Sequence, residues 1–313
     1  MSKSPALWKP VLIAALILMA AADLLSGGGG ISLPEGAVLW KLRLPRVLTA
    51  LLAGSALALS GAQMQALFRN PLADPHIMGV SSGAGLGAAI AALAASSAVF
   101  SGWTLVAAAF AGALVASVLI LRASLRLKHP GTLLIFGVML GFIFSACSSV
   151  LQYSAGEESL KIFYNWMAGS FSAGRYADIA LMGGTLLTGL LLAVLNGKGL
   201  DLTLFGEPYT RLSGGSPRRI LTLSMISCCL MTGTVTAFCG PVGFVGIVAP
   251  HVVRYLSGRS DHRCVLPWSM VSGAALALTA DAAANLSRVP LPVGSTMAFI
   301  GIPFILVLML RSK

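Results

Sequence analysis

The chain has 313 residues, of which 57% are hydrophobic and only 10% are charged, and its mean hydropathy is +0.88. A soluble domain carries about 25% charged residues, so this composition excludes a soluble globular protein and indicates an integral membrane protein. The formal net charge of +11 could indicate a nucleic-acid-binding protein, but the basic residues lie in short gaps between apolar segments. We therefore expect no nucleic-acid partner.

Apolar segments of membrane-spanning length recur along the whole chain. A helix needs roughly 20 apolar residues to cross a hydrocarbon core about 30 Å thick. The sequence therefore predicts an all-α, polytopic membrane protein of about ten transmembrane helices, forming a single domain over residues 1–313. The expected segments are 8–25, 47–68, 77–95, 103–121, 132–155, 177–196, 220–238, 244–256, 264–286 and 294–310.

The first apolar segment has two interpretations. Lys3 and Lys9 precede its apolar run, and Ala20 to Ala22 offer small residues, as in a cleaved signal peptide. An uncleaved first helix is favoured because it places both termini on the same side of the membrane. Gly27 to Gly30 would end this helix, and an exposed connector is expected up to Lys41.

The segment 47–68 carries no charge and has a small residue at every fourth position, namely Ala50, Gly54, Ala58, Ala62 and Ala66. In lipid, such a stripe lets a second helix approach closely, so this segment is predicted to be the centre of the bundle. A second stripe of the same kind follows in the next segment, at Gly83, Gly87, Ala91 and Ala95.

The distribution of basic residues predicts the orientation. With a cytoplasmic N-terminus, 15 of the 21 Lys and Arg residues fall on the inside and six on the outside, as the positive-inside rule requires. Both termini are then cytoplasmic. Three of the six outer residues, Lys41, Arg43 and Arg46, are clustered against this bias. Arg side chains often only anchor helix ends at the interface, but a docking surface for acidic groups explains the cluster better.

Two further features come from the residues alone. Residues 197–219 form the longest expected cytoplasmic loop, which is polar and Gly-rich. Asp281 is the clearest ionisable residue inside a span. Such a residue marks a pathway, a relay or a buried pair, or else it makes a packing hydrogen bond to Ser or Thr neighbours, and the sequence leaves both interpretations open. An ion-coupled carrier working alone would depend on Asp281.

No catalytic constellation is visible. Five cysteines lie in or beside apolar segments without metal-ligand spacing, and four histidines are scattered. The chain lacks a Gly-rich phosphate loop ending in Lys-Ser/Thr, so it cannot hydrolyse ATP unaided. We therefore expect no enzyme activity, no metal site and no cofactor.

Several motifs resemble one family of membrane permeases. They are L-R-L-P-R from Leu42, G-A-Q-M-Q-A-L-F-R-N-P-L-A-D-P from Gly61, G-V-S-S-G-A-G from Gly79, the G-E pair at Gly206, and G-P-V-G-F-V-G-I-V-A-P-H from Gly240. Together they are similar to the FecCD family, the permease subunits of ABC importers for iron–siderophores, haem and vitamin B12. The resemblance covers nearly the whole chain and implies the type II ABC-importer permease fold.

The resemblance also implies partners and site residues. It implies a permease dimer, either of two identical chains or of two paired permeases, with two copies of an ATP-binding subunit on the cytoplasmic side and an extracytoplasmic substrate-binding protein. The implied binding-protein contacts are Arg43, Arg46 and Arg288, the last in place of an Arg that relatives often carry where this chain has Asn285. The implied ATPase-coupling residues are Gly206, Glu207, Arg211 and Gly214.

The remaining candidates are residues of the pathway or of helix packing. They are Gly54, Ala58, Gly61, Gln65, Asn70, Pro71, Ser81, Ser82, Gly83 and Asp281. The substrate expected from the resemblance is an iron–siderophore, because most of the family serves ferric chelates, with vitamin B12 or haem as alternatives. The expected location is the inner, cytoplasmic membrane.

Overall fold

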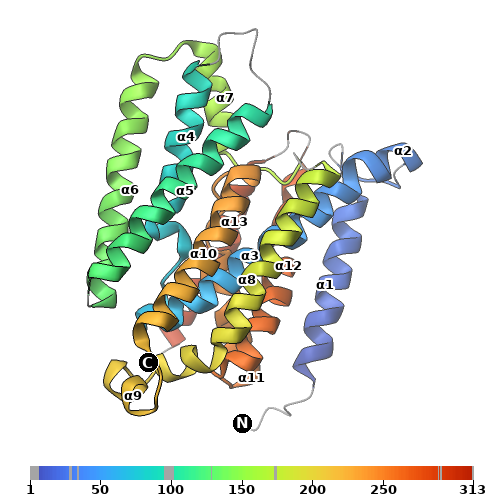
Figure 1. Cartoon of the computed structure of the whole chain (residues 1–313). Coiled ribbons are helices and arrows are strands. Elements are labelled where there is room, and N and C mark those ends of the chain that lie inside the picture. Colours follow the sequence, from blue (N-terminus) through green and yellow to red (C-terminus); the bar gives the residue numbers. More distant parts are fainter. Residues whose placement is uncertain are drawn as a thin grey trace.

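The computed structural model describes residues 7–27, 30–33, 35–94, 102–127, 129–172, 175–287, 289 and 291–311. Its architecture is a helix bundle (Figure 1). Two strands of two residues each, β1 (Ser26–Gly27) and β2 (Gly30–Ile31), pair antiparallel just after the first helix.

The helices that match the ten predicted segments have these bounds: α1 Trp8–Leu25, α3 Leu44–Phe68, α4 Val80–Ala94, α5 Gly102–Arg126, α6 Pro130–Tyr153, α8 Tyr176–Thr203, α10 Pro217–Cys239, α11 Val245–Ser257, α12 His262–Asn285 and α13 Val293–Arg311. The shorter helical elements are α2 Gly36–Val38, the π-helical turn η1 Leu39–Arg43, the 3-10 turn η2 Pro75–Met78, α7 Glu157–Met167 and α9 Glu207–Leu212.

Within the described residues, seven helices are long and apolar enough to cross a membrane. They correspond to α1, α3 together with α2 and η1, α5, α6, α8, α10 and α12. Two more, α4 and α13, offer shorter apolar runs, and α11 has only 13 residues with Pro250 inside. All ten predicted segments are thus helices. Because α4, α11 and α13 are short, we expect packing against neighbouring helices to hold them in the bundle.

Helix α3 lies at the centre, as its small-residue stripe predicts. Its apolar window is 83% buried inside the protein, against 11% for α1. A Cβ added at Gly54 would lie 2.3 Å from the carbonyl oxygen of Gly273 on α12, and one at Gly61 would lie 2.0 Å from that of Gly246 on α11. Only glycine therefore permits these backbones to approach so closely.

The second stripe packs α4 against α5. A Cβ at Gly83 would lie 2.7 Å from the carbonyl oxygen of Gly112, and one at Gly87 would lie 2.0 Å from that of Ala108. Ala95 lies outside the described residues. In Figure 1, α4, α5, α6 and α7 occupy one side of the bundle and α1 the other, with α3, α8 and α10 between them.

Two connectors are more helical than the sequence predicts. The expected exposed connector becomes helical at Gly36 and runs through η1 into α3, and Pro45 lies in the first turn of α3, just after this π-helical turn. Helix α8 continues to Thr203, seven residues into the expected loop 197–219. Gly199 there allows contact with Ile220 of α10, which offsets the low helix propensity of glycine.

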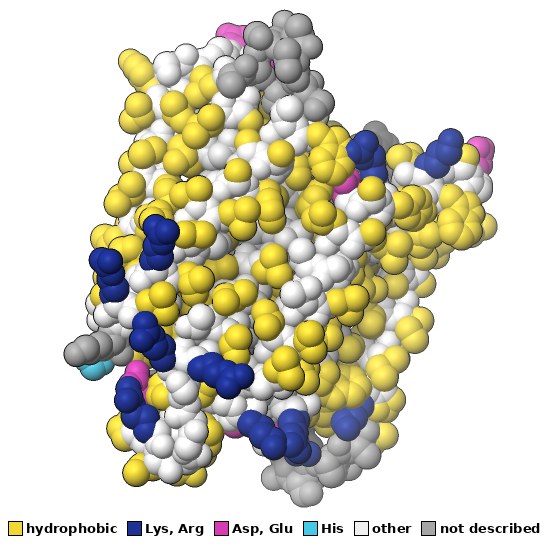
Figure 2. Space-filling model, in the orientation of Figure 1, with side chains coloured by type: hydrophobic (Ala, Val, Ile, Leu, Met, Phe, Trp, Pro, Cys, Tyr) yellow, Lys and Arg dark blue, Asp and Glu magenta, His cyan; other side chains and the backbone are white. Residues whose placement is uncertain are grey.

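The start of α1 and the end of α13 lie at the same end of the bundle, the end that carries α9 (Figure 1). Figure 2 shows Lys and Arg side chains gathered towards this end of the visible face, while the face between the two ends is largely hydrophobic. The shape and surface are those of a protein that spans a membrane several times.

Candidate functional site

A cavity of about 320 Å³ lies between α4, α6 and α7. Ser81 and Ser82, both predicted as pathway residues, line it from α4. Helix α6 contributes hydroxyl and amide groups spaced three or four residues apart on one face, and α7 contributes an aromatic and apolar edge. The other lining residues are Gly85, Ser145, Ser148, Ser149, Gln152, Phe163, Tyr164, Met167 and Pro241, and none of the described lining residues is charged.

The polar lining is preorganised by hydrogen bonds. The Gln152 side chain donates to the Ser148 hydroxyl at 3.0 Å, and the Ser145 hydroxyl lies 3.5 Å from that of Ser82, across the gap between α6 and α4. Ser81 contacts both the imidazole of His76 and, at 3.3 Å, the hydroxyl of Thr236. The cavity thus offers neutral donors and acceptors on one wall and aromatic surface on another.

Other predicted pathway residues are packing residues in this structure. Gly54, Ala58 and Gly61 are buried in the contacts of α3 with α12 and α11. Gln65 donates from Nε2 to the carbonyl oxygens of Gly246 (3.1 Å) and Ile247 (3.3 Å), and its Oε1 accepts from Arg254. Gly83 is buried against α5. These five residues hold the bundle together and do not line the cavity.

Asn70 and Pro71 form the turn after α3. The carboxamide oxygen of Asn70 accepts from the backbone N–H of Leu72 at 2.9 Å, and Arg69 adopts a left-handed φ of 48° that ends the helix. Asp74 then caps η2 by accepting from the His76 N–H at 2.8 Å. Complete burial raises the pKa of Asp74. This turn positions Ser81 at the cavity.

The outer basic cluster is arranged differently from the expectation. Arg43 is only 8% exposed; its Nη1 donates to the carbonyl oxygens of Leu24 (2.8 Å) and Ser32 (2.7 Å), and its Nη2 to the Ser32 hydroxyl (2.8 Å). The π-helical turn η1 places this side chain inward. Lys41, by contrast, is exposed. Arg43 therefore fastens the segment around β1 and β2 to the start of α3.

Arg46 lies in a buried ionic cluster. Its Nη2 is 3.2 Å from Asp23 Oδ1, on α1, and its Nε is 2.8 Å from Asp281 Oδ2, on α12. Asp23 and Asp281 are 0% and 1% exposed, and Arg46 is 10% exposed. Asp281 is thus a member of a buried ion pair within the bundle, which is one of the roles that the sequence left open. Asn285 donates to the Asp281 carbonyl oxygen, at 2.6 Å, and Arg288 lies outside the described residues.

The coupling segment contains a six-residue helix, α9, between two glycines with positive φ, Gly206 (96°) and Gly214 (78°). The Thr210 hydroxyl donates to the carbonyl oxygens of Leu202 (3.1 Å) and Gly206 (2.8 Å), which ties α9 to the end of α8. Glu207 and Arg211 form an ion pair of 3.5 Å on its surface.

Apolar side chains project from this same polar segment. Leu212 is 88% exposed and Phe205 is 71% exposed, and Tyr209 is also exposed between them. Large apolar side chains grouped at an exposed turn indicate a contact surface for another protein. A Cβ at Gly206 would lie 3.4 Å from Nη1 of Arg69, so the segment also touches the turn at the end of the central helix.

Sequence reasoning missed two parts of this arrangement. Asp23 carries the same signal as Asp281, an ionisable residue inside an apolar segment, and could have been found in the same way. The hydroxyl face of α6 appears in the sequence as Ser145, Ser148, Ser149 and Gln152, spaced at helical intervals. This face lines a cavity only because α7 packs beside it, and α7 was not among the predicted segments.

The profile of the FecCD transport family matches residues 11–311. The chain belongs to the FecCD transport family. It is 40% identical over 277 residues to the vitamin B12 import system permease protein BtuC of Klebsiella pneumoniae, an alignment that covers 88% of this chain and 83% of that protein. It is 37% identical over 305 residues to the BtuC protein of Salmonella paratyphi A, covering 96% of this chain and 93% of that one.

Solved structures agree with this assignment. An inward-facing structure of an ABC transporter described as metal-chelate type superposes with a TM-score of 0.84 at 32% identity, covering 96% of this chain and 98% of that one. A Streptococcus pneumoniae complex, PsaBC with Fab, shares the fold at a TM-score of 0.55 and 17% identity, covering 94% of each chain. The chain is a multi-span transport permease of the ABC-importer type, with the fold that the sequence predicts.

Proposed function

We propose that this chain is the membrane subunit of an ATP-driven importer that moves vitamin B12 or a chelate of similar bulk into the cytoplasm. It would lie in the inner membrane as a dimer of identical chains, with both termini cytoplasmic. The whole of 1–313 would act as one permease domain. The neutral cavity between α4, α6 and α7 carries this proposal, together with the vitamin B12 permeases among its relatives.

The chemistry of the cavity fits such a cargo. Hydroxyl groups of α4 and α6 and the Gln152 amide can exchange hydrogen bonds with neutral amide side chains of a corrin, while Phe163 and Tyr164 offer aromatic surface. A lining without fixed charge holds a neutral cargo weakly, which suits passage rather than storage. The iron–siderophore expected from the sequence stays a prediction, and the relatives favour vitamin B12 over it.

We place the ATPase contact at α9. Phe205, Tyr209 and Leu212 would enter a groove on the ATP-binding subunit, while Gly206 and Gly214 provide the turns that present them. The ion pair between Glu207 and Arg211 would keep α9 helical. Because Arg69 lies against Gly206, a movement of α9 would reach the end of α3 directly.

The outer docking surface takes a revised form. Direct docking by Arg43 and Arg46 would require their guanidinium groups to leave the internal partners that hold them. We infer instead that Lys41, which is exposed, meets acidic groups of the binding protein, and that Arg43 and Arg46 position the surface around it. A role for Arg288 stays a prediction from the resemblance.

Transport in reconstituted vesicles tests the proposal. The permease, co-purified with its ATPase and binding protein, should take up radiolabelled cobalamin only when ATP is present, and an ionophore should leave uptake unchanged. Ferric siderophore and haem serve as parallel substrates. Uptake that survives without ATP and stops when the ion gradient is collapsed would refute an ABC importer and support the ion-coupled carrier. The side chain of Asp281, on which that carrier would depend, is paired with Arg46 in this structure.

A further inference from the structure

Two arginines lie in the last turns of α5, on its exposed side. Arg122 and Arg126 are one helical turn apart, and both are exposed. Within the described part of the chain, neither has an ion-pair or hydrogen-bond partner, whereas Arg211 and Arg259 are each paired with a carboxylate. The charge at the end of α5 is therefore available for a ligand.

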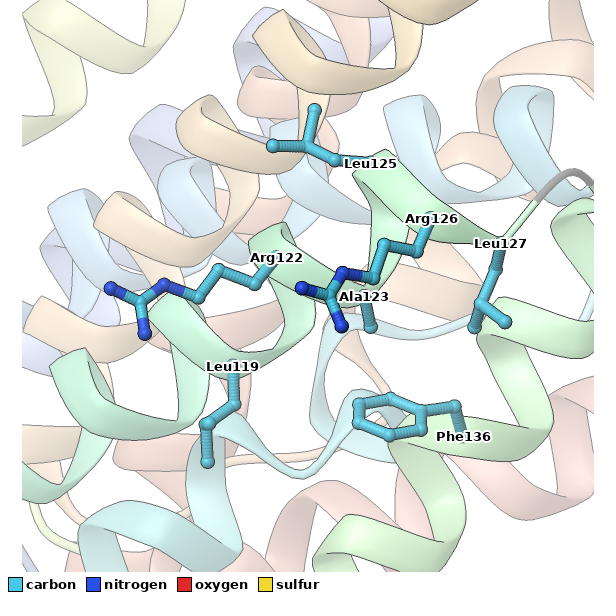
Figure 3. Close-up of a pocket in the computed structure, with 7 residues that line it drawn as sticks. All are labelled: Leu119, Arg122, Ala123, Leu125, Arg126, Leu127 and Phe136. Carbon is cyan, nitrogen blue, oxygen red and sulfur yellow. The ribbon is translucent and has the colours of Figure 1, made fainter.

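These arginines border a cavity of about 610 Å³ between α5 and α6. Figure 3 shows the two side chains extended in the same direction, with Leu119 and the ring of Phe136 beneath them. Ala123, Leu125 and Leu127 complete the lining. The site therefore combines two cationic groups on one side with an apolar floor.

The apolar face of α5 leads directly to this site. Val115, Val118 and Leu119 are 55%, 46% and 37% exposed, and they share a helix face with Arg122. On α6, Ile135 and Met139 are also exposed, at 62% and 51%. In a protein that spans a membrane, an apolar face that is exposed over several turns is suited to contact with acyl chains. Arg122 and Arg126 then lie at the depth where the headgroups begin.

A neighbouring cavity shows at which end of the bundle the two arginines lie. Arg126 also lines a space of about 560 Å³ that includes Glu207 and Arg211 of α9. Among the described residues of that lining, Glu207 is the acidic one, and it is paired with Arg211. The arginine pair therefore lies at the α9 end, which faces the cytoplasm in the proposed orientation, and the carboxylate of Glu207 in the described lining is already paired with Arg211.

We propose that Arg122 and Arg126 bind the headgroup phosphate of an anionic phospholipid of the inner leaflet, with an acyl chain lying along the α5–α6 groove. Guanidinium groups pair with phosphate through parallel N–H donors, and the apolar floor accepts the lipid's first methylenes. The inference uses the proposed orientation but is independent of the cargo. A lipid held here would contact α6, whose other face lines the cargo cavity.

Native mass spectrometry of the purified full-length chain tests the site. The titrations use dioleoylphosphatidylglycerol, dioleoylphosphatidylcholine with the same acyl chains, and inorganic phosphate as a competitor. We expect tighter binding of the first phosphatidylglycerol than of phosphatidylcholine, and no displacement by millimolar phosphate. The Arg122→Gln/Arg126→Gln variant should bind phosphatidylglycerol about 25-fold more weakly, since each basic residue near the membrane surface contributes about a fivefold factor.

Two further variants keep the result interpretable. Arg122→Lys/Arg126→Lys preserves the charge and should retain most of the binding, which also shows that substitutions here permit folding. Arg263→Gln removes another exposed basic residue, at the start of α12, and should leave binding within about twofold of the wild type. Equal binding of both lipids, displacement by phosphate, or unchanged binding in the double Gln variant would overturn the proposal.

Discussion

Nε of Arg46, on α3, lies 2.8 Å from Oδ2 of Asp281, on α12, and Nη2 of the same guanidinium group lies 3.2 Å from Oδ1 of Asp23, on α1. Helices α1, α3 and α12 are therefore joined by one buried cation that pairs with two carboxylates. The Ser26 hydroxyl also lies 3.2 Å from Arg46 Nη2, which satisfies part of the remaining hydrogen-bonding capacity. Such a cluster fixes which faces of the helices meet.

Loss of Arg46 should be more harmful than loss of Asp281. Arg46→Leu leaves two carboxylates buried without a cation, and removing one partner of a buried ion pair costs about 3–5 kcal/mol. Asp281→Asn leaves Arg46 paired with Asp23 and should lower the melting temperature less. The measurement is thermal unfolding of the detergent-purified protein. Arg46→Leu/Asp281→Leu should be more stable than Arg46→Leu alone, and a double variant that is less stable would contradict the ion pair.

The contact of Gly54 with Gly273 should not tolerate a side chain. Gly54→Ala places a Cβ 2.3 Å from a backbone carbonyl oxygen, so α3 and α12 must separate. We expect a marked loss of folded protein and of thermal stability. Gly184→Ala is the matched control, because Gly184 lies in α8 with open space around it, and alanine there should be neutral or stabilising by up to about 1 kcal/mol. Equal effects of the two substitutions would disprove the packing role.

The exposed apolar residues of the coupling segment should be needed for assembly and not for folding. Leu212→Asp, at a side chain that is 88% exposed, should reduce co-purification of the ATPase at least tenfold while the melting temperature of the isolated permease stays unchanged. Ser213→Asp adds the same charge to the next, also exposed position and is the control. If Ser213→Asp disrupted assembly equally, the effect would be one of charge rather than of the Leu212 side chain.

A bulky side chain that fills the cavity between α4, α6 and α7 should reduce transport. Ser82→Trp places an indole in a space of about 320 Å³ and should lower ATP-dependent uptake strongly, while the ATPase and binding protein still co-purify. Val115→Trp, on the exposed face of α5, adds the same bulk away from the cavity and should leave uptake near the wild-type level. Normal uptake by Ser82→Trp would exclude this cavity from the pathway.

The revised outer surface predicts a salt-dependent effect of Lys41. Lys41→Glu should weaken capture of the binding protein by several-fold at low salt and less at high salt, because an exposed charge pair is screened. Surface plasmon resonance over a range of salt concentrations measures this effect. Arg43→Gln should lower the stability of the segment around Ser32 as well, since three hydrogen bonds are lost. A change in docking for Arg43→Gln but none for Lys41→Glu would support direct docking by the arginine.

The sequence by itself determined the class of protein and the central helix. Apolar segments of spanning length show where helices lie, because the bilayer leaves the backbone no partner outside the helix. The four-residue spacing from Ala50 to Ala66 then shows which helix the others surround. The family motifs, being continuous in the chain, could also be read without a structure.

Only the tertiary structure decided what the charged side chains do. Arg43 and Arg46 look like outer docking residues in the sequence, because a sequence shows that a charge is near a helix end and not which way its side chain points. The π-helical turn at Leu39–Arg43 and the approach of Asp23 and Asp281 from two other helices turn both arginines inward. Contacts between distant segments depend on the packing of the whole bundle, and no local pattern contains them.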